Sequence, residues 1–312
     1  MTARIINGLE IAAEIRSELK DRVARLQAAG KVPSLGVVLV GDDPASLSYV
    51  KAKEKGALEI GMTEKTIRLP ADTSESKVIE VVEELNRDPL VDGILIQTPL
   101  PGHIDTEKVL YYISPEKDVD GFHPVNLGKL LRGQPCFLPC TPHGIQQMLV
   151  RCGYDPAGKH VVICGRSNLV GKPLAAILLQ KAKGANATVT VVHTGTGHIA
   201  NFTRQADILV AAMGSPLCIT ADMVKEGAVV IDVGVNRVED KSKEKGYRLA
   251  GDVEFEAVKV KAAAITPVPG GVGPMTVTML LQNTIESAER LQKRHCEEPA
   301  GDAAIHPRRM EI

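Results

Sequence analysis

The 312-residue sequence contains no tryptophan, and aromatic residues make up only 3% of it. Proteins that hold single-stranded nucleic acid stack its bases on aromatic side chains, so this scarcity argues against that class. The formal net charge is −1, from 37 basic and 38 acidic residues, which gives no basic field for nucleic acid or an anionic membrane. No apolar run approaches the length of a membrane span, so we expect neither partner.

Cysteine is scarce as well, and six residues in so long a chain do not make a disulfide framework. Cys136, Cys140, His143 and Cys152 lie near one another, but the pair Cys-x3-Cys has no second well-spaced pair. We therefore expect no metal site. The N-terminal residues MTARIINGLEI lack the apolar core of a secretory signal, which favours a cytoplasmic location.

Apolar runs of strand length alternate with helical patterns along the whole chain. The run 34–41 is a strand covered on both faces, and the periodicity of 44–60 predicts a helix. Further strands are expected at 160–164, 188–193, 207–213, 228–234 and 262–266. This alternation predicts an α/β protein of two domains, the second a Rossmann-like doubly wound sheet, with a cleft between them.

The boundary is expected in a stretch dense in glycine, proline and aspartate, between residues 115 and 142. We assign residues 1–140 to a catalytic, substrate-binding domain and 141–274 to a nucleotide-binding domain. A helix over 275–294 is expected to return to the first domain. The polar segment 295–312 is expected to be a disordered tail.

The segment TPVPGGVGPMT, residues 266–276, holds three prolines and three glycines between an apolar run and a helical pattern. Proline fixes φ and glycine reaches conformations closed to other residues, so the segment is a shaped loop. Its backbone at Pro269, Gly270 and Gly273 can approach a ligand, and the glycines can offer it N–H groups, although a rigid turn alone also explains the composition.

A second glycine-bearing loop, GRSNLVGKP, follows the expected strand 160–164 and precedes a helix. Glycine at such a turn lets a phosphate approach the backbone at the positive end of the helix. Five residues separate Gly165 from Gly171 and Pro173 follows Lys172, so a P-loop is excluded. The fingerprint Gly-x-Gly-x-x-Gly is not met either, and a tight strand-to-helix turn stays open.

The neighbours of this loop distinguish two cofactors. NAD sites carry an acid at the end of the second strand, but here that strand ends in His193 and Thr194. Arg166 lies inside the loop, where its guanidinium can bind a 2′-phosphate. The two observations favour NADP over NAD.

Residues suited to proton transfer are found in the first half. Tyr49 and Lys53 are four apart on the expected helix 44–60 and share one face, although a solvated lysine is the ordinary meaning of that spacing. Gln97 ends an apolar strand, where ligands of open α/β sheets bind. Asp120 precedes Gly121 in a turn. A cleft that desolvates Lys53 would lower its pKa toward neutrality.

Eight segments together resemble the bifunctional methylenetetrahydrofolate dehydrogenase/cyclohydrolase family, over about residues 4 to 292. They are SLSYVKAKEK, GILIQTPLP, PEKDVDGFHPVN, PCTPHGI, CGRSNLVGKP, VIDVGVN, GDV and TPVPGGVGPMT. The resemblance implies oxidation of 5,10-methylene-tetrahydrofolate with NADP to 5,10-methenyl-tetrahydrofolate, then hydrolysis to 10-formyl-tetrahydrofolate. It also implies a homodimer and a place in one-carbon metabolism and purine biosynthesis.

The resemblance assigns a role to each candidate residue. Lys53 is the catalytic lysine and Gln97 its hydrogen-bonding partner, while Tyr49 stacks on the folate and Asp120 holds the polar edge of the pterin. The cofactor contacts that it implies are Gly165, Arg166, Ser167, Thr194 and Val235. The loop residues Pro269, Gly270 and Gly273 form a wall of the cleft between folate and nicotinamide.

Departures from the family pattern are few. Thr98 replaces the leucine common after the glutamine, and Gly195 replaces a frequent basic residue, which leaves Arg166 as the main phosphate contact. Two alternatives are an enzyme with the dehydrogenase activity only and a non-catalytic nucleotide-binding protein. The presence of Lys53, Gln97 and Asp120 argues against the first alternative. The presence of Lys53 and of the glycines at 270, 271 and 273 argues against the second.

Overall fold

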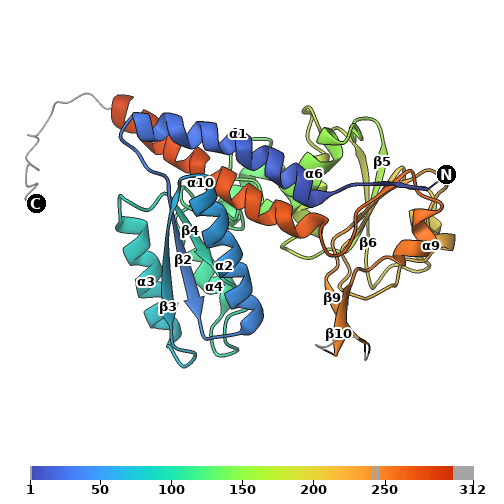
Figure 1. The fold of residues 1–312 in the computed structure, drawn as a ribbon, viewed down its shortest axis with the longest axis horizontal. Helices are drawn as coiled ribbons and strands as arrows, with labels where there is room; N and C mark the ends of the chain where they lie inside the picture. Colours follow the sequence, from blue (N-terminus) through green and yellow to red (C-terminus); the bar gives the residue numbers. More distant parts are fainter. Residues whose placement is uncertain (1, 241, 243–245, 298–312) are drawn as a thin grey trace, which may run out of the picture.

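The computed structural model describes residues 2–240, 242 and 246–297. Two parallel sheets stand side by side, and two long helices cross from one to the other along the same side of the molecule (Figure 1). These helices are α1 (Gly8–Ala28) and α10 (Val272–Glu297), which pack against each other. The side chain of Asn7 begins α1 as expected, since it accepts the backbone N–H groups of Leu9 and Glu10.

The first sheet has the strand order β3-β2-β4, with every pair parallel. Its strands are β2 (Ser34–Val40), β3 (Thr63–Leu69) and β4 (Gly93–Ile96). The helices around it are α2 (Pro44–Glu59), α3 (Glu75–Arg87) and α4 (Thr106–Tyr111). Helix α5 (Pro124–Leu131) packs instead against α7 (Gly171–Leu178) of the second half. Helix α2 begins at a proline after Asp43, whose carboxylate accepts the Ser46 N–H at 2.8 Å.

The second sheet has six parallel strands in the order β1-β11-β8-β7-β5-β6. Its strands are β1 (Arg4–Ile5), β5 (His160–Cys164), β6 (Thr188–Val192), β7 (Ile208–Ala211), β8 (Val229–Asp232) and β11 (Ala264–Ile265). The other elements are α6 (Cys140–Arg151), α7 (Gly171–Leu178), α8 (Ala200–Thr203), the 3-10 helix η1 (Ala221–Met223), α9 (Phe255–Lys259) and the hairpin β9 (Asn236–Glu239) with β10 (Tyr247–Ala250). The order reverses at β5, which has β6 on one side and β7 on the other. The predicted α/β class with a doubly wound second sheet is confirmed.

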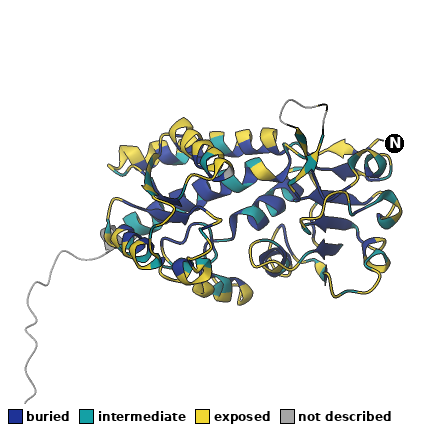
Figure 2. Cartoon of the chain, turned by 90° about the horizontal axis from the view of Figure 1, so that it is seen from below, coloured by how far each residue is buried: buried dark blue, intermediate teal, exposed yellow. Residues whose placement is uncertain are grey.

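Side chains of the central strands alternate between two apolar layers. Val161 and Ile163 of β5 face a core that also includes α1, α2, α6 and α10, whereas Val162 and Cys164 face a second core. The first core continues into the other sheet through residues such as Leu35. Figure 2 shows the central strands largely in the buried colour and many exposed residues on the outer faces of helices. The two halves therefore share one hydrophobic core.

Three details differ from the sequence-based expectations. Strand β1 lies beside β11 in the second sheet, because Arg4 pairs with Ala264, although residues 1–140 were assigned to the first domain. Helix α7 begins at Gly171 rather than Pro173. Helix α10 begins at Val272 rather than at residue 275, so the last part of the predicted loop 266–276 is helical. The helix continues through Glu297, past the expected start of the tail at 295, and residues 298–312 lie outside the described part of the chain.

Candidate active site

Lys53 and Gln97 meet in a buried position in the first half. Helix α2 carries Lys53, and Gln97 follows β4, so the two come from neighbouring elements. The Lys53 Nζ donates to Gln97 Oε1 at 2.9 Å, and Gln97 Nε2 donates to the Thr98 carbonyl at 2.8 Å. The amide is thereby oriented with its oxygen toward the lysine. Lys53 is only 8% exposed, so the alternative of a solvated lysine on the helix surface is wrong.

Burial sets the charge balance at this pair. It lowers the pKa of Lys53, and the nearby Asp120, Cys140 and Glu64 act in the opposite direction. Burial also raises the pKa of Asp120, against which the Lys53 ammonium acts. A lysine with a lowered pKa next to a partly buried carboxylate is suited to take up and release a proton.

The turn that carries Asp120 is fixed by another aspartate. Asp118 accepts the N–H groups of Phe122 at 3.2 Å and His123 at 2.8 Å, and the Nδ2 of Asn126 at 2.8 Å. Burial raises the pKa of Asp118 to about 7, although these hydrogen bonds lower it. These hydrogen bonds hold the turn in which Asp120 lies close enough to Lys53 for the two charges to interact.

The loop after β5 lies where the strand order of the second sheet reverses. Ligands of doubly wound sheets bind at such a point. Gly165 has φ of 132°, and a Cβ on it would lie 2.2 Å from the carbonyl oxygen of Ala212 after β7, so a side chain does not fit. Ser167 Oγ accepts the N–H groups of Val170 at 3.1 Å and Gly171 at 3.4 Å, which shapes the entry into α7.

Two polar residues lie at this edge of the sheet, one inside the loop and one after the neighbouring strand. Arg166 is exposed and lies directly after Gly165, whose N–H donates to the Val192 carbonyl at 2.8 Å. Thr194 is exposed and follows β6, which pairs with β5. A backbone free of side chain at Gly165, a helix N-terminus and an exposed guanidinium fit the phosphates of a dinucleotide.

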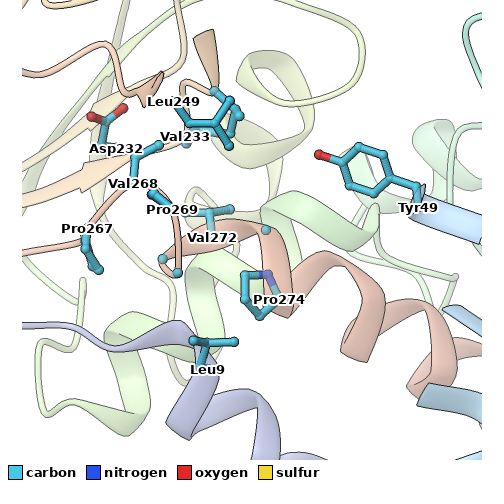
Figure 3. Close-up of a pocket in the computed structure, with 14 residues that line it drawn as sticks. Leu9, Tyr49, Asp232, Val233, Leu249, Pro267, Val268, Pro269, Val272 and Pro274 are labelled. Carbon is cyan, nitrogen blue, oxygen red and sulfur yellow. The ribbon is translucent and has the colours of Figure 1, made fainter. Parts of the chain in front are cut away.

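A pocket of about 400 Å³ lies between α2 and the loops of the second half. The predicted residues Tyr49, Val235, Pro269, Gly270 and Gly273 all line it. The rest of its wall comprises Leu9, Asp232, Val233, Leu249, Pro267, Val268, Gly271, Val272 and Pro274. Figure 3 shows the ring of Tyr49 across open space from the proline-rich loop, with its hydroxyl directed toward the side of Val233 and Leu249.

The predicted residues therefore form three groups. Lys53, Gln97 and Asp120 lie together, one helical turn along α2 from Tyr49. Tyr49 faces the pocket wall that contains Val235 and the 266–276 loop. Gly165, Arg166, Ser167 and Thr194 lie at the carboxyl edge of the second sheet and do not line this pocket.

Sequence reasoning missed several residues of the site. Asp232 ends β8 and lines the pocket, and burial raises its pKa to about 6. Asp252, after the hairpin, is fully buried. Each aspartate lies within two residues of a glycine in the segments VIDVGVN and GDV, and this was the available signal. Leu9 and Leu249 gave no signal, because single exposed leucines are common.

Comparison with known proteins settles the family. The model described as tetrahydrofolate dehydrogenase/cyclohydrolase, catalytic domain, matches residues 6–120, and the corresponding NAD(P)-binding domain matches 139–292. The chain belongs to the tetrahydrofolate dehydrogenase/cyclohydrolase family. It is 59% identical over 288 residues to the bifunctional protein FolD of Syntrophus aciditrophicus, covering 92% of this chain and 98% of that protein.

Solved structures of this family agree with the fold. The bifunctional FolD of Campylobacter jejuni is 44% identical with a TM-score of 0.87, over 92% of this chain and 99% of that chain. FolD of Trypanosoma brucei, solved with NADP and an inhibitor, is 40% identical with a TM-score of 0.87, over 93% and 98%. The predicted bifunctional dehydrogenase/cyclohydrolase function is confirmed, and the second half is an NAD(P)-binding domain, in agreement with the predicted class of cofactor.

No helix in the described part of the chain is long and apolar enough to cross a membrane.

Proposed function

We propose that this family member carries out its two reactions in the pocket between the two halves. NADP accepts a hydride from 5,10-methylene-tetrahydrofolate, and the resulting 5,10-methenyl-tetrahydrofolate is hydrolysed to 10-formyl-tetrahydrofolate. The observation that supports this most directly is the buried 2.9 Å hydrogen bond between Lys53 and Gln97, one helical turn from Tyr49 in the pocket wall.

In the oxidation step, the residues of this chain mainly position the reactants. The folate nitrogens stabilise the developing cation, so alignment of hydride donor and acceptor is the main requirement. Tyr49 is proposed to stack on the folate ring, while Val235, Pro269, Gly270 and Gly273 form the opposite wall. Gly165, Arg166, Ser167 and Thr194 are proposed to hold the cofactor phosphates.

In the hydrolysis step, Lys53 is proposed to move the protons. The neutral amine takes a proton as water adds to the methenyl carbon, and the ammonium then gives that proton to the ring nitrogen as its bond to that carbon breaks. The remaining hydroxyl proton is released to solvent as the formyl C=O bond forms. Burial lowers the lysine pKa and so favours the neutral amine that the first of these steps requires. Gln97 holds the amine in place, and Asp120 is proposed to hold the polar edge of the pterin.

The location, the oligomeric state, the pathway and the domain division of the enzyme stay predictions. We propose a cytoplasmic homodimer with a role in purine biosynthesis, divided near residue 140 into folate and nucleotide domains. The matches of two family domains on either side of that position support the division. Sedimentation analysis of the full chain tests the dimer.

The decisive experiment is a spectrophotometric assay with methylene-tetrahydrofolate, run in parallel with NADP and NAD. We expect reduced cofactor with NADP, followed by loss of the methenyl absorbance. No reduced cofactor in either reaction would refute the dehydrogenase activity. Persistent methenyl product would indicate an enzyme with the dehydrogenase activity only.

A further inference from the structure

Asp252 collects four hydrogen bonds from two separate loops. Its Oδ2 accepts the N–H groups of Met213 at 2.6 Å and Gly214 at 3.0 Å. Its Oδ1 accepts the N–H of Ser215 at 3.0 Å and the Nδ2 of Asn236 at 2.9 Å. Three consecutive N–H groups of the loop after β7 thus converge on one carboxylate, and the same carboxylate holds the start of the hairpin.

A second carboxylate holds Asp252 in turn. Asp232 accepts the N–H groups of Asp252 at 2.9 Å and Gly234 at 3.1 Å through Oδ1, and that of Val253 at 3.0 Å through Oδ2. The fit is close, because a Cβ on Gly251 would lie 1.8 Å from Asp232 Oδ2 and one on Gly234 would lie 2.2 Å from Asp252 Oδ1. The two aspartates form one hydrogen-bonded unit, and Asp232 is itself part of the pocket wall.

The position of this unit relates it to the cofactor loop. The loop that Asp252 holds begins after Ala212, whose carbonyl oxygen is the atom that a Cβ on Gly165 would meet. Asn236 begins the hairpin that contributes Leu249 to the pocket. Asp252 therefore lies between the loop proposed to hold phosphates and the pocket proposed to hold the reacting ends of cofactor and folate.

We propose that Asp252 is a positioning residue for NADP, which fixes the loop after β7 and the hairpin in the arrangement that the cofactor needs. The inference rests on the proposed NADP-dependent oxidation. Asp252 has no hydrogen bond to Lys53, Gln97 or Asp120, which lie in the other half. Hydrolysis of the methenyl compound, which needs no cofactor, is therefore independent of Asp252.

The test is Asp252→Asn in the full chain. The amide keeps the shape of the carboxylate, but its single oxygen serves only one pair of donors and its NH2 faces the other pair. We expect the Kd and KM for NADP to rise about tenfold, as for the loss of one or two charge-assisted hydrogen bonds. The hydrolysis rate and the KM for folate should change less than about twofold.

Asp207→Asn is the matched control, because Asp207 also accepts a backbone N–H, from His160 at 2.9 Å, just before β7 at the opposite edge of the sheet. It should leave NADP binding unchanged. Asn236→Ala is a milder variant that removes one donor and should raise the Kd for NADP about threefold. If Asp252→Asn does not fold, the Kd of Asn236→Ala for NADP tests the proposal instead.

Two outcomes overturn the inference. One is an unchanged Kd for NADP in folded Asp252→Asn or in Asn236→Ala. The other is a parallel fall of oxidation and hydrolysis in these variants, which would indicate a purely structural role. A wild-type chain that does not bind NADP would refute the proposed oxidation as well, so the two failures are distinguishable.

Discussion

Replacing Lys53 with methionine separates the chemistry of the site from its packing. Methionine keeps much of the lysine stem but has no proton to transfer. The variant loses the 2.9 Å hydrogen bond and leaves Gln97 Oε1 buried without this donor, which costs about 1–3 kcal/mol of stability. Removing a buried ammonium offsets part of that cost. We therefore expect the free energy of unfolding to change by no more than about 2 kcal/mol.

The effect on hydrolysis should be larger. Loss of a general acid–base group slows a reaction by about 10²- to 10⁴-fold, equivalent to about 2.7–5.4 kcal/mol in the barrier. The decay of methenyl absorbance measures this directly. NADP binding, which we assign to the loop around Gly165 in the other half, should be unchanged in a titration. In the wild type, the rate should rise with pH as Lys53 becomes neutral, through a pKa that burial has lowered.

Lys55→Met is the control, because Lys55 is exposed on the same helix, two residues further on. It should leave hydrolysis unchanged. Hydrolysis at the wild-type rate by folded Lys53→Met, with the same pH profile, would remove lysine from the mechanism and refute the assignment.

Three further variants test other parts of the site. Arg166→Ala should weaken binding of NADP at least tenfold more than NAD in parallel titrations, because the guanidinium is proposed to contact the 2′-phosphate; equal weakening contradicts that role. Gly165→Ala should reduce NADP affinity more than tenfold while hydrolysis continues, since the added Cβ would lie 2.2 Å from a carbonyl oxygen and the loop has to shift. Asp118 has a pKa raised to about 7, so the folded state holds its proton more tightly than the unfolded state, and stability falls as pH rises from about 4 to 7. In urea unfolding, the free energy of unfolding of Asp118→Asn relative to the wild type should therefore be higher at pH 8 than at pH 5. A difference between the two proteins that does not depend on pH would contradict the raised pKa.

Local patterns predicted the elements whose structure depends on nearby residues. The apolar run at β2 is a buried strand, the side chain of Asn7 caps α1, and Tyr49 and Lys53 lie on one helix, as the spacing indicated. The desolvation of Lys53 was conditional on a cleft, because spacing alone does not distinguish a buried lysine from a solvated one.

Features that depend on distant residues were not predictable in the same way. Asp252 looks like an ordinary turn residue until the fold brings Met213 and Asn236 to it. Strand β1 is two residues long, too short for any periodicity, and its partner lies near the other end of the chain. Apolar and polar residues alternate only weakly along β9 and β10, because the hairpin lies largely outside the core.

The pairing of Arg4 with Ala264 has a consequence for how the molecule can be divided. The nucleotide sheet takes its edge strand from the first residues of the chain and its remaining strands from residues after 160. A fragment that starts at residue 141 would lack that strand, and one that ends at residue 140 would retain it without a partner sheet. Neither half is a contiguous segment, so exchange of domains between relatives would have to transfer both ends of the chain together.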